Sequence, residues 1–505
     1  MAMILVTGSL VVGIVLLLGF VLRWRKIDMP GPKGHPIVGN ALQLSKNVPY
    51  VQIQEWSKEF GSIFKLQLFR EEVVVCNDYE SIMMTKSDDF AGRPKSWRFT
   101  YALPGGNNGI AFQDFTKSFK IMLKLSSRGL RPYGASNQAR DLFNKPIMEC
   151  LTEFLSHNGE AFNPNLHVDH VVVKFILKLM LGEHVKLTAG DFSAVEKMLQ
   201  RVKHMAQGSG EELELFPWLR HFGLKSYRDL MELNKIGNDA INSWIDRYRL
   251  KMEELNLPDE DLERPATFLA VLLRAYDDGQ IDMDNIKSTI FEIVVGGTVT
   301  VKSHIESLIL LMLNYPEVQE RVIAEIQDAI PEDRSPTLAN REKLPYTEAT
   351  VLEAVRFLTV SPLGVPHKTT RDTTLGPYNI PKDTQVWTNL WGAHHDPRYF
   401  PDPNTFNPDR FLDSEGKTYN RADVKSFLPF GVGKRTCLGE KIAIPRIFLF
   451  FSNMLHRMRL IPADGKNIPS CDLKNFMTAI TYQPPPFYMK VEPLRTQINI
   501  GRRSV

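Results

Sequence analysis

The stretch that decides the fold reads FGVGKRTCLG and covers residues 430–439. Gly431 and Gly433 allow a tight loop, so that backbone N–H groups can point at the sulfur of Cys437 and stabilise it as a thiolate. Gly439 allows a helix to begin directly behind the loop, and the positive end of the helix dipole also favours a negative sulfur. A lone cysteine is more often a small buried apolar side chain, but the surrounding loop favours a ligand here.

A long apolar helix is expected over residues 286–313, and it contains two adjacent glycines, Gly296 and Gly297. Two glycines inside a helix cost about 2 kcal/mol relative to alanine, so they need a reason such as the close approach of a bound group. Thr298 and Thr300 follow directly. The alternative to a functional role is that their hydroxyls only bond back to helix carbonyls, as mid-helix threonines commonly do.

These motifs resemble the cytochrome P-450 family. The haem-binding loop of that family has Phe, two residues, Gly, one residue, Arg, one residue, Cys, one residue and Gly, and residues 430–439 match every fixed position. Glu353 and Arg356 match the family's Glu-x-x-Arg, a spacing that puts both side chains on one face of a helix. Residues 406–411 resemble the family's Pro-Glu-Arg-Phe segment, and Arg410 within them would complete a network with Glu353 and Arg356.

The resemblance implies a bound haem b whose iron is ligated by the sulfur of Cys437. An anionic sulfur pushes electron density onto the iron and favours O–O cleavage. Arg435 is then expected to pair with a haem propionate through charge-assisted hydrogen bonds. Phe119 stands where the family usually has a tryptophan near the propionates. The other positions that the resemblance assigns to haem binding are Phe430, Gly431, Gly439, His367 and Lys124.

The resemblance assigns oxygen activation to Gly297, Thr298 and Thr300. In the family an acid stands immediately before the last of these residues, but this chain has Val299 there. The usual acid–alcohol relay of protons is therefore in question, and the Thr300 hydroxyl with ordered water is the remaining route. The walls of the substrate pocket are expected at residues 97–108, 291–299, 361–365 and 476–481.

On this resemblance, the protein is a monooxygenase that uses O2 and electrons from an NADPH-dependent reductase to hydroxylate or epoxidise a lipophilic small molecule. Cytochrome b5 is a second expected electron donor. The chain has no GxGxxG loop, which agrees with an external reductase. A basic face is expected to dock that acidic reductase, and it is formed by Lys120, Lys124, Lys434, Arg435 and Lys441.

Two other classes of function stay open. One is a haem-thiolate isomerase or dehydratase that rearranges a peroxide without a reductase, which the valine at position 299 favours because this reaction needs no proton relay. The other is a non-catalytic haem-binding protein, suggested by Val299 and Phe119 together.

The hydrophobic pattern predicts a mainly α fold with a small β part. No Gly/Ser-rich linker or internal repeat divides the chain, so a single large domain is expected, and the resemblance implies that it has the cytochrome P-450 fold. Pro445, early in the helix after the cysteine, predicts a kink or a delayed helix start. His394 and His395 are adjacent and therefore point apart, so we expect them to be structural. Helices are predicted over residues 50–60, 117–130, 137–156, 192–205, 226–255, 286–313, 316–330 and 346–358, and strands over 62–68, 73–75 and within 369–386.

Residues 2–22 carry no charge and are long enough to span a bilayer as a helix. The basic residues within 23–26 predict that this segment is kept as an anchor and that the rest of the chain faces the cytosol. We therefore expect a membrane anchor over residues 1–26, a Pro/Gly-rich neck over 27–40 and the haem-thiolate catalytic domain over 41–505. The expected location is the endoplasmic reticulum membrane, with a single span.

The charge and the cysteine spacing bear on some other classes. A formal net charge of +3 over 505 residues gives no reason to expect a nucleic-acid partner. The four cysteines lie far apart without a CxxC pair, which fits neither a disulfide framework nor a zinc site and indicates a reducing compartment.

Overall fold

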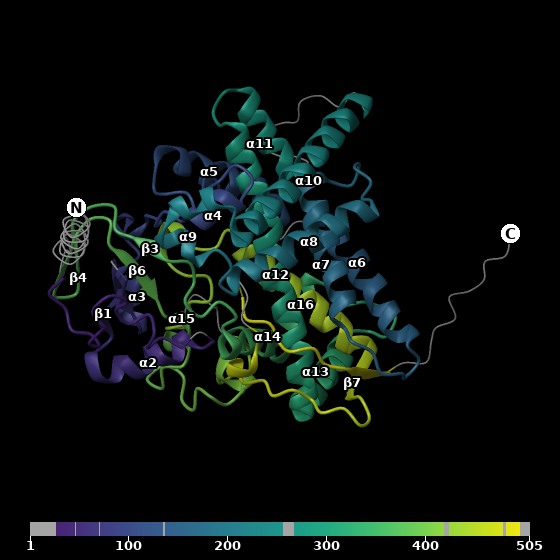
Figure 1. The fold of residues 1–505 in the computed structure, drawn as a ribbon. Coiled ribbons are helices and arrows are strands. Elements are labelled where there is room, and N and C mark those ends of the chain that lie inside the picture. Colours follow the sequence, from purple (N-terminus) through teal and green to yellow (C-terminus); the bar gives the residue numbers. More distant parts are fainter. Residues whose placement is uncertain are drawn as a thin grey trace, which may run out of the picture. The chain divides into compact units, whose positions relative to one another are not determined.

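The computed structural model describes residues 27–45, 47–69, 71–134, 137–255, 267–418, 424–477 and 481–494. The anchor predicted over residues 1–26 lies outside them. The fold is mainly helical with a few short strands, as the sequence predicts (Figure 1). Two compact units alternate along the chain: the first comprises the residues up to Pro94, Pro362–Ala393 and Gly431–Arg435, and the second comprises Lys95–Ser361, His394–Phe430 and Thr436 onward.

The first unit is built on a four-stranded sheet of order β1-β2-β6-β3. The pairs β1–β2 and β3–β6 are antiparallel, and β2–β6 is parallel. Alternate residues of β1, Phe64 and Leu66, are fully buried and pack with Val73 and Val75 of β2 and with Ile53. A separate antiparallel hairpin joins β4 to β5. The strands are β1 Ile63–Leu68, β2 Glu71–Cys76, β3 His367–Lys368, β4 Thr373–Leu375, β5 Tyr378–Ile380 and β6 Gln385–Thr388, and the helical segments that begin in this unit are α2 Pro49–Phe60, α3 Tyr79–Met84, η1 Asp88–Phe90, α15 Leu390–His394 and η7 Gly433–Arg435.

The second unit is a helical body with one antiparallel strand pair, β7–β8. Its α-helices are α4 Trp97–Ala102, α5 Lys117–Leu130, α6 Asn137–Ser156, α7 Asn165–Leu181, α8 Ala189–Ala206, α9 Glu211–Leu215, α10 Lys225–Leu255, α11 Phe268–Asp277, α12 Met283–Asn314, α13 Pro316–Ala329, α14 Pro345–Leu358 and α16 Glu440–Arg457. Its shorter elements are η2 Arg131–Tyr133, η3 Pro217–Phe222, η4 Leu338–Lys343, η5 Pro408–Phe411, η8 Leu473–Asn475, β7 Met458–Pro462 and β8 Met489–Pro493.

Helix α12 is the core helix of the second unit. Asp282 caps its N-terminus by accepting the backbone N–H of Asn285, in a capping box. The helix packs against α7, α8, α10, α14 and α16. Among the described residues it is the one helix long and apolar enough to cross a membrane, but two thirds of its most apolar window is buried, as in the core helix of a soluble body.

The structure confirms the predicted helices and corrects some boundaries. Helices α5 and α6 match the prediction at both ends, whereas α12 begins three residues earlier than predicted, at Met283. Helix α16 begins at Glu440 with Pro445 inside it, so the predicted delayed start is wrong. Helices α7 and α11 and the β7–β8 pair are additional elements that the hydrophobic pattern does not predict.

Candidate functional site

The Cys437 loop, residues 430–439, has the backbone geometry that its glycines predict. The N–H of Cys437 donates to the carbonyl oxygen of Phe430 at 2.9 Å and closes the loop. Gly431 and Gly433 lie at φ 71° and 72°, in the left-handed region that favours glycine. A Cβ on Gly433 would lie 2.5 Å from the carbonyl oxygen of Lys86, so only glycine fits there.

The sulfur of Cys437 differs from the other cysteine sulfurs. Its side chain is exposed, whereas Cys76, Cys150 and Cys471 are buried. Desolvation by the surrounding protein still raises the pKa of the Cys437 thiol above its ordinary value. Hydrogen bonds from the backbone N–H groups of Gly439 and Glu440 offset part of this rise. The sulfur is therefore accessible to a ligand while lying within a partly desolvated setting. N–H groups aimed at it fit a thiolate bound to haem iron, because they offset part of its negative charge.

The Glu-x-x-Arg pair and Arg410 lie together in the second unit. Glu353 and Arg356 are fully buried, and the Nε and Nη2 atoms of Arg356 donate to the carboxylate of Glu353 at 2.7 and 2.8 Å. Arg410 donates to the same carboxylate at 3.1 Å, and so does the backbone N–H of Asn407 at 2.9 Å. One carboxylate therefore serves two guanidinium groups and ties α14 to η5.

His394 connects this network to the segment before the Cys437 loop. The Nη1 atom of Arg356 donates to the carbonyl oxygen of His394 at 2.8 Å, and the backbone N–H of Leu428 donates to the imidazole Nε2 at 2.9 Å. The Nδ1 atom lies 2.8 Å from the Thr359 hydroxyl. Burial, together with His395 and Arg356, holds the pKa of His394 well below its ordinary value, so the ring is neutral. The ring's contacts are those of a structural residue, in line with the sequence-based expectation.

Helix α12 gives different surroundings to its two adjacent glycines. No atom of another element lies within 4 Å of the position that a Cβ on Gly296 would take, whereas a Cβ on Gly297 would lie 2.6 Å from Cδ1 of Ile176 on α7. Close packing against Ile176 therefore explains why position 297 is a glycine. Gly296 is the glycine that keeps space open beside the helix, and Thr300 lies four residues later on the same face.

Both threonines bond back to α12. The Thr300 hydroxyl donates to the carbonyl oxygen of Gly296 at 2.7 Å, and the Thr298 hydroxyl donates to that of Val294 at 2.6 Å. Thr298 is fully buried, whereas Thr300 is partly exposed. Val299 is buried and supplies no ionisable group next to Thr300. Of the two hydroxyls, only that of Thr300 is accessible to a bound molecule.

In the first unit, two predicted haem-binding residues are fixed by neighbouring carbonyls. His367 is buried and its Nδ1 lies 2.8 Å from the carbonyl oxygen of Phe90, while the Nε of Arg435 donates to that of Ala91 at 2.7 Å. Burial and the nearby Arg93 lower the pKa of His367 to about 3, so its ring is neutral and its Nδ1–H is the donor to Phe90. A carboxylate partner for His367 would require the protonated ring, so Arg435 is the stronger candidate for a propionate.

Sequence reasoning missed Arg93. Its side chain is buried in the first unit, and its Nη1 donates to the carbonyl oxygens of Val365 and Pro366 at 3.0 and 2.8 Å. A buried cation next to His367 is a further candidate for binding a carboxylate. No spacing motif marks Arg93 in the sequence, and only the pairing of β3 with the segment at Gly92 brings it to this place.

Lys124, which the sequence also predicts to bind haem, has an exposed side chain on α5. Phe119 is buried on the same helix, five positions earlier. Five residues correspond to about 500° of helical rotation, so the two side chains lie on different faces of α5. The structure therefore does not bring Lys124 and Phe119 to one point.

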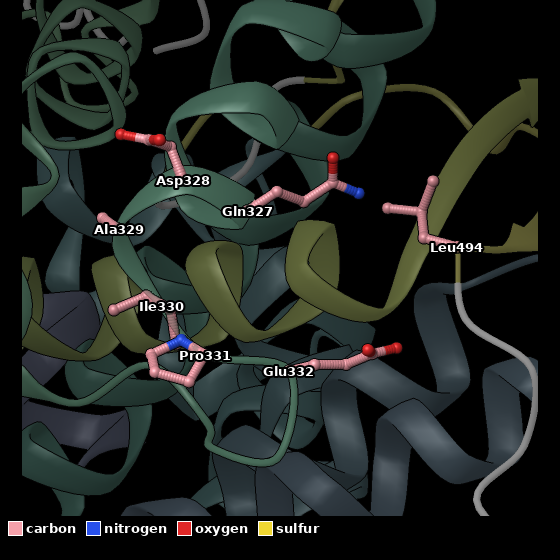
Figure 2. Close-up of a pocket in the computed structure, with 7 residues that line it drawn as sticks. All are labelled: Gln327, Asp328, Ala329, Ile330, Pro331, Glu332 and Leu494. Atoms are coloured by element: carbon pink, nitrogen blue, oxygen red, sulfur yellow. The ribbon is translucent and has the colours of Figure 1, made fainter.

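One surface pocket of about 420 Å³ lies elsewhere in the second unit (Figure 2). It is lined by the last turn of α13, by the loop that follows it and by Leu494, and it contains none of the predicted site residues. Among the described residues that line it, Asp328 and Glu332 are the ionisable ones. The chemistry that the Cys437 loop offers is absent from it.

Comparison with known proteins identifies the family. The family model described as Cytochrome P-450 matches residues 29–491. The chain is 28% identical to Cytochrome P-450 1A1 of Limanda limanda over 467 residues, which cover 87% of this chain and 86% of that protein. It is 30% identical to Cytochrome P-450 1A1 of Oryzias latipes, covering 85% of each chain, and 29% identical to Cytochrome P-450 2B19 of Mus musculus, covering 91% and 92%. The chain belongs to the cytochrome P-450 family, its enzyme class is that of a P-450 monooxygenase, and its family implies a haem with a cysteine thiolate ligand.

Proposed function

We propose that this protein binds haem b through Cys437 and oxidises a lipophilic small molecule with O2, taking electrons from NADPH through a separate reductase. One oxygen atom enters the substrate, and the other leaves as water with two electrons and two protons. The observation that carries the proposal is the accessible sulfur of Cys437 beside the N–H groups of Gly439 and Glu440. When bound, the haem would supply the iron that activates O2.

The residues around the sulfur hold charge in fixed places. Desolvation raises the pKa of Cys437, and the N–H groups of Gly439 and Glu440 offset part of that rise. A cationic ligand would favour the thiolate further. Arg435 is held by the carbonyl oxygen of Ala91, and its guanidinium cation is the proposed partner of a propionate carboxylate. Glu353 and Arg356 do not touch the sulfur and act as positioning residues, because they hold α14 to His394 and η5.

The supply of protons is where this chain departs from the family pattern. The Thr300 hydroxyl donates to the carbonyl oxygen of Gly296, so it can accept a hydrogen bond from water while keeping this contact. Val299 cannot hold a proton. We therefore assign the role of ordering water to Thr300, and water rather than a neighbouring acid supplies the protons.

The substrate and the cellular partners follow from the family pattern and the apolar N-terminal segment. The uncharged residues 2–22 are proposed to anchor the chain in the endoplasmic reticulum membrane. A membrane-bound enzyme of this class would meet lipophilic substrates and a membrane-bound, NADPH-dependent reductase there. Cytochrome b5 is proposed as a second donor of electrons.

One alternative is favoured by a specific residue. With Val299 in place of an acid, a peroxide that already contains its activated oxygen would need neither a proton relay nor a reductase. An isomerase would keep both oxygen atoms of the peroxide in its product, whereas a dehydratase would release one of them as water. This reaction differs from oxygenation because it needs neither NADPH nor a reductase.

The test uses the full chain in lipid vesicles with a P-450 reductase. A lipophilic library is first screened for compounds that change the haem absorption spectrum, and the hits are then incubated with NADPH and O2. We expect a product that depends on both NADPH and O2 and carries one atom from labelled O2. Turnover of a peroxide without reductase, and no NADPH-dependent product from any hit, would support the alternative.

A further inference from the structure

Two histidine rings converge at the connection between α6 and α7. His157 directly follows α6, which ends at Ser156, and His167 lies in the first turn of α7, which begins at Asn165. Their Nε2 atoms are 3.4 Å apart, and the ring planes meet at 80°. Neither residue belongs to the haem site, and neither was singled out by the sequence.

Neighbouring side chains fix both rings. His157 stacks on Phe162 with ring centroids 4.0 Å apart and planes 5° apart. His167 meets Phe154 edge-on at 5.6 Å. The Nδ1 atom of His167 lies 2.9 Å from the carboxylate of Glu153. Both rings are therefore held in place before any ligand arrives, which lowers the entropy cost of binding one.

The contact with Glu153 determines which nitrogen of His167 is available. A carboxylate accepts hydrogen bonds, so the Nδ1–H of His167 is the donor. A neutral imidazole that is protonated at Nδ1 has its lone pair at Nε2, and this is the atom that faces His157. Either a proton on the facing nitrogen of His157 or a metal ion between the two rings satisfies that lone pair.

The distance favours the ion. Nitrogen ligands lie about 2.0–2.1 Å from Zn²⁺, and two of them on a tetrahedral ion lie about 3.3–3.4 Å apart. The observed separation of the two Nε2 atoms is 3.4 Å. A carboxylate that accepts the other N–H of a ligating histidine is the usual outer partner of such a metal, and Glu153 has that position.

We propose that His157 and His167 bind one dication that prefers imidazole ligands, Zn²⁺ or Cu²⁺, with Glu153 orienting His167 and water completing the coordination. Within the part of the chain that the structure describes, no group of three or more His, Cys, Asp or Glu side chains is placed to hold a metal ion, so the remaining ligands are water. The side chain of His167 is 25% exposed, which leaves room for them.

The ion would cross-link the two ends of the α6–α7 connection. The two ligands are ten residues apart and enclose Phe162, whose backbone N–H and carbonyl pair with Met489 of β8 at 2.9 and 3.0 Å. Bridging the ligands therefore restrains both the connection and its bridge to β8. Hydrogen exchange of the amides in residues 157–164 should slow when the ion binds, with no change in α10 or α11.

The experiment titrates the full, haem-loaded chain, purified without a histidine tag and treated with chelator, with Zn²⁺, Cu²⁺ and, as a hard-ion control, Mg²⁺. Calorimetry should show one Zn²⁺ or Cu²⁺ per chain and no Mg²⁺. His157→Gln and His167→Gln should each weaken binding at least about tenfold, and Glu153→Gln about tenfold, as expected for an outer partner. Paramagnetic resonance of bound Cu²⁺ should show two coupled nitrogens in the parent chain and one in either histidine variant.

The matched control is His170→Gln, because His170 is an exposed histidine on the same helix that stacks on Phe192 instead. Binding should be unchanged in this variant. An unchanged carbon monoxide spectrum of the reduced haem shows that each variant is folded. The proposal is wrong if the His157→Gln/His167→Gln double variant still binds one ion with the affinity of the parent chain, if His170→Gln weakens binding equally, or if the parent chain binds no ion.

Discussion

The Cys437 loop and the Gly296–Thr300 segment of α12 carry the two halves of the proposed chemistry, and they are built differently. The loop is determined by its backbone: two left-handed glycines and the Cys437–Phe430 hydrogen bond set its path. The α12 segment is regular helix, and its properties depend on which side chains stand at positions 296, 299 and 300. The loop matches the family pattern throughout, whereas the helix departs from it at Val299. Binding the haem is thus the more constrained task, and the use of oxygen is the more variable one.

Cys437→Ala tests the loop most directly and should have the largest effect. Without the sulfur, the iron loses its thiolate ligand, so the carbon monoxide spectrum of the reduced protein should lose its thiolate form and turnover should be abolished. The measurement is the spectrum together with product formation in the reconstituted system. Haem still ligated through sulfur, with undiminished turnover, would contradict the assignment of Cys437.

Glu353→Gln tests the network that supports the loop. Removing this buried carboxylate leaves Arg356 and Arg410 without their counter-charge, and breaking a buried pair in this way costs about 3–5 kcal/mol. The free energy of unfolding by denaturant is the measurement. The matched control is Glu55→Gln, which breaks an exposed pair with Lys58 at the same i, i+3 spacing and should cost less than about 1 kcal/mol. Equal losses in the two variants would show that burial does not set the strength of the network.

Gly431→Ala and Gly433→Ala separate the two causes of glycine in the loop. Both positions are left-handed, which costs an alanine about 1–2 kcal/mol. Only Gly433 also lies against the carbonyl oxygen of Lys86, so its alanine should lose a further 1–3 kcal/mol, roughly the cost of overpacking. Thermal unfolding and haem content measure both variants, and a larger loss for Gly431→Ala would overturn this reading of the loop.

How far the sequence predicts the fold depends on whether a segment has a period of its own. Helices α5 and α6 are amphipathic or clearly bounded, and the prediction finds both ends. Helix α7 is missed because its residues 168–181 are mostly apolar and include a run of β-branched valines, so they show no clean helical period. The β7–β8 pair is missed because its strands are only 5 residues long and 26 residues apart, so no local sequence pattern predicts that they pair.

The candidate site shows the same division. Spacing motifs predict Cys437, Glu353 and Arg356, because each motif lies within at most ten consecutive residues of the sequence. Arg93 and the role of His394 depend on contacts with residues far along the chain, such as the backbone of Val365 and Leu428, and cannot be found by spacing. From the sequence, the close approach of a bound group is the one reason offered for both glycines of α12. The structure separates them, because Gly297 packs against Ile176 and Gly296 does not.

Thr300→Val tests the helix side of the comparison and should have a smaller effect than the loop variants. The hydroxyl is lost with little change in shape, so water near the site loses its partner, and product formed per NADPH should fall by about tenfold. Thr298→Val is the matched control, because the Thr298 hydroxyl is fully buried and bonded to Val294. The ratio of product to NADPH consumed is the measurement. Equal losses in both variants would mean that helix structure, not the exposed hydroxyl, is responsible.

Gly296→Ala and Gly297→Ala should show the smallest effects and the sharpest contrast. A Cβ on Gly296 meets no other element, so in the haem-free chain Gly296→Ala should stabilise the protein by up to about 1 kcal/mol through helix propensity. Gly297→Ala should cost about 1 kcal/mol because it presses on Ile176, and Ile176→Val should relieve that cost. If the space beside Gly296 receives the haem and its ligands, the gain from Gly296→Ala should shrink or reverse in the haem-loaded chain. Comparing thermal unfolding with and without haem therefore measures whether that face of α12 borders the bound group, and an equal gain in both states would place the group elsewhere.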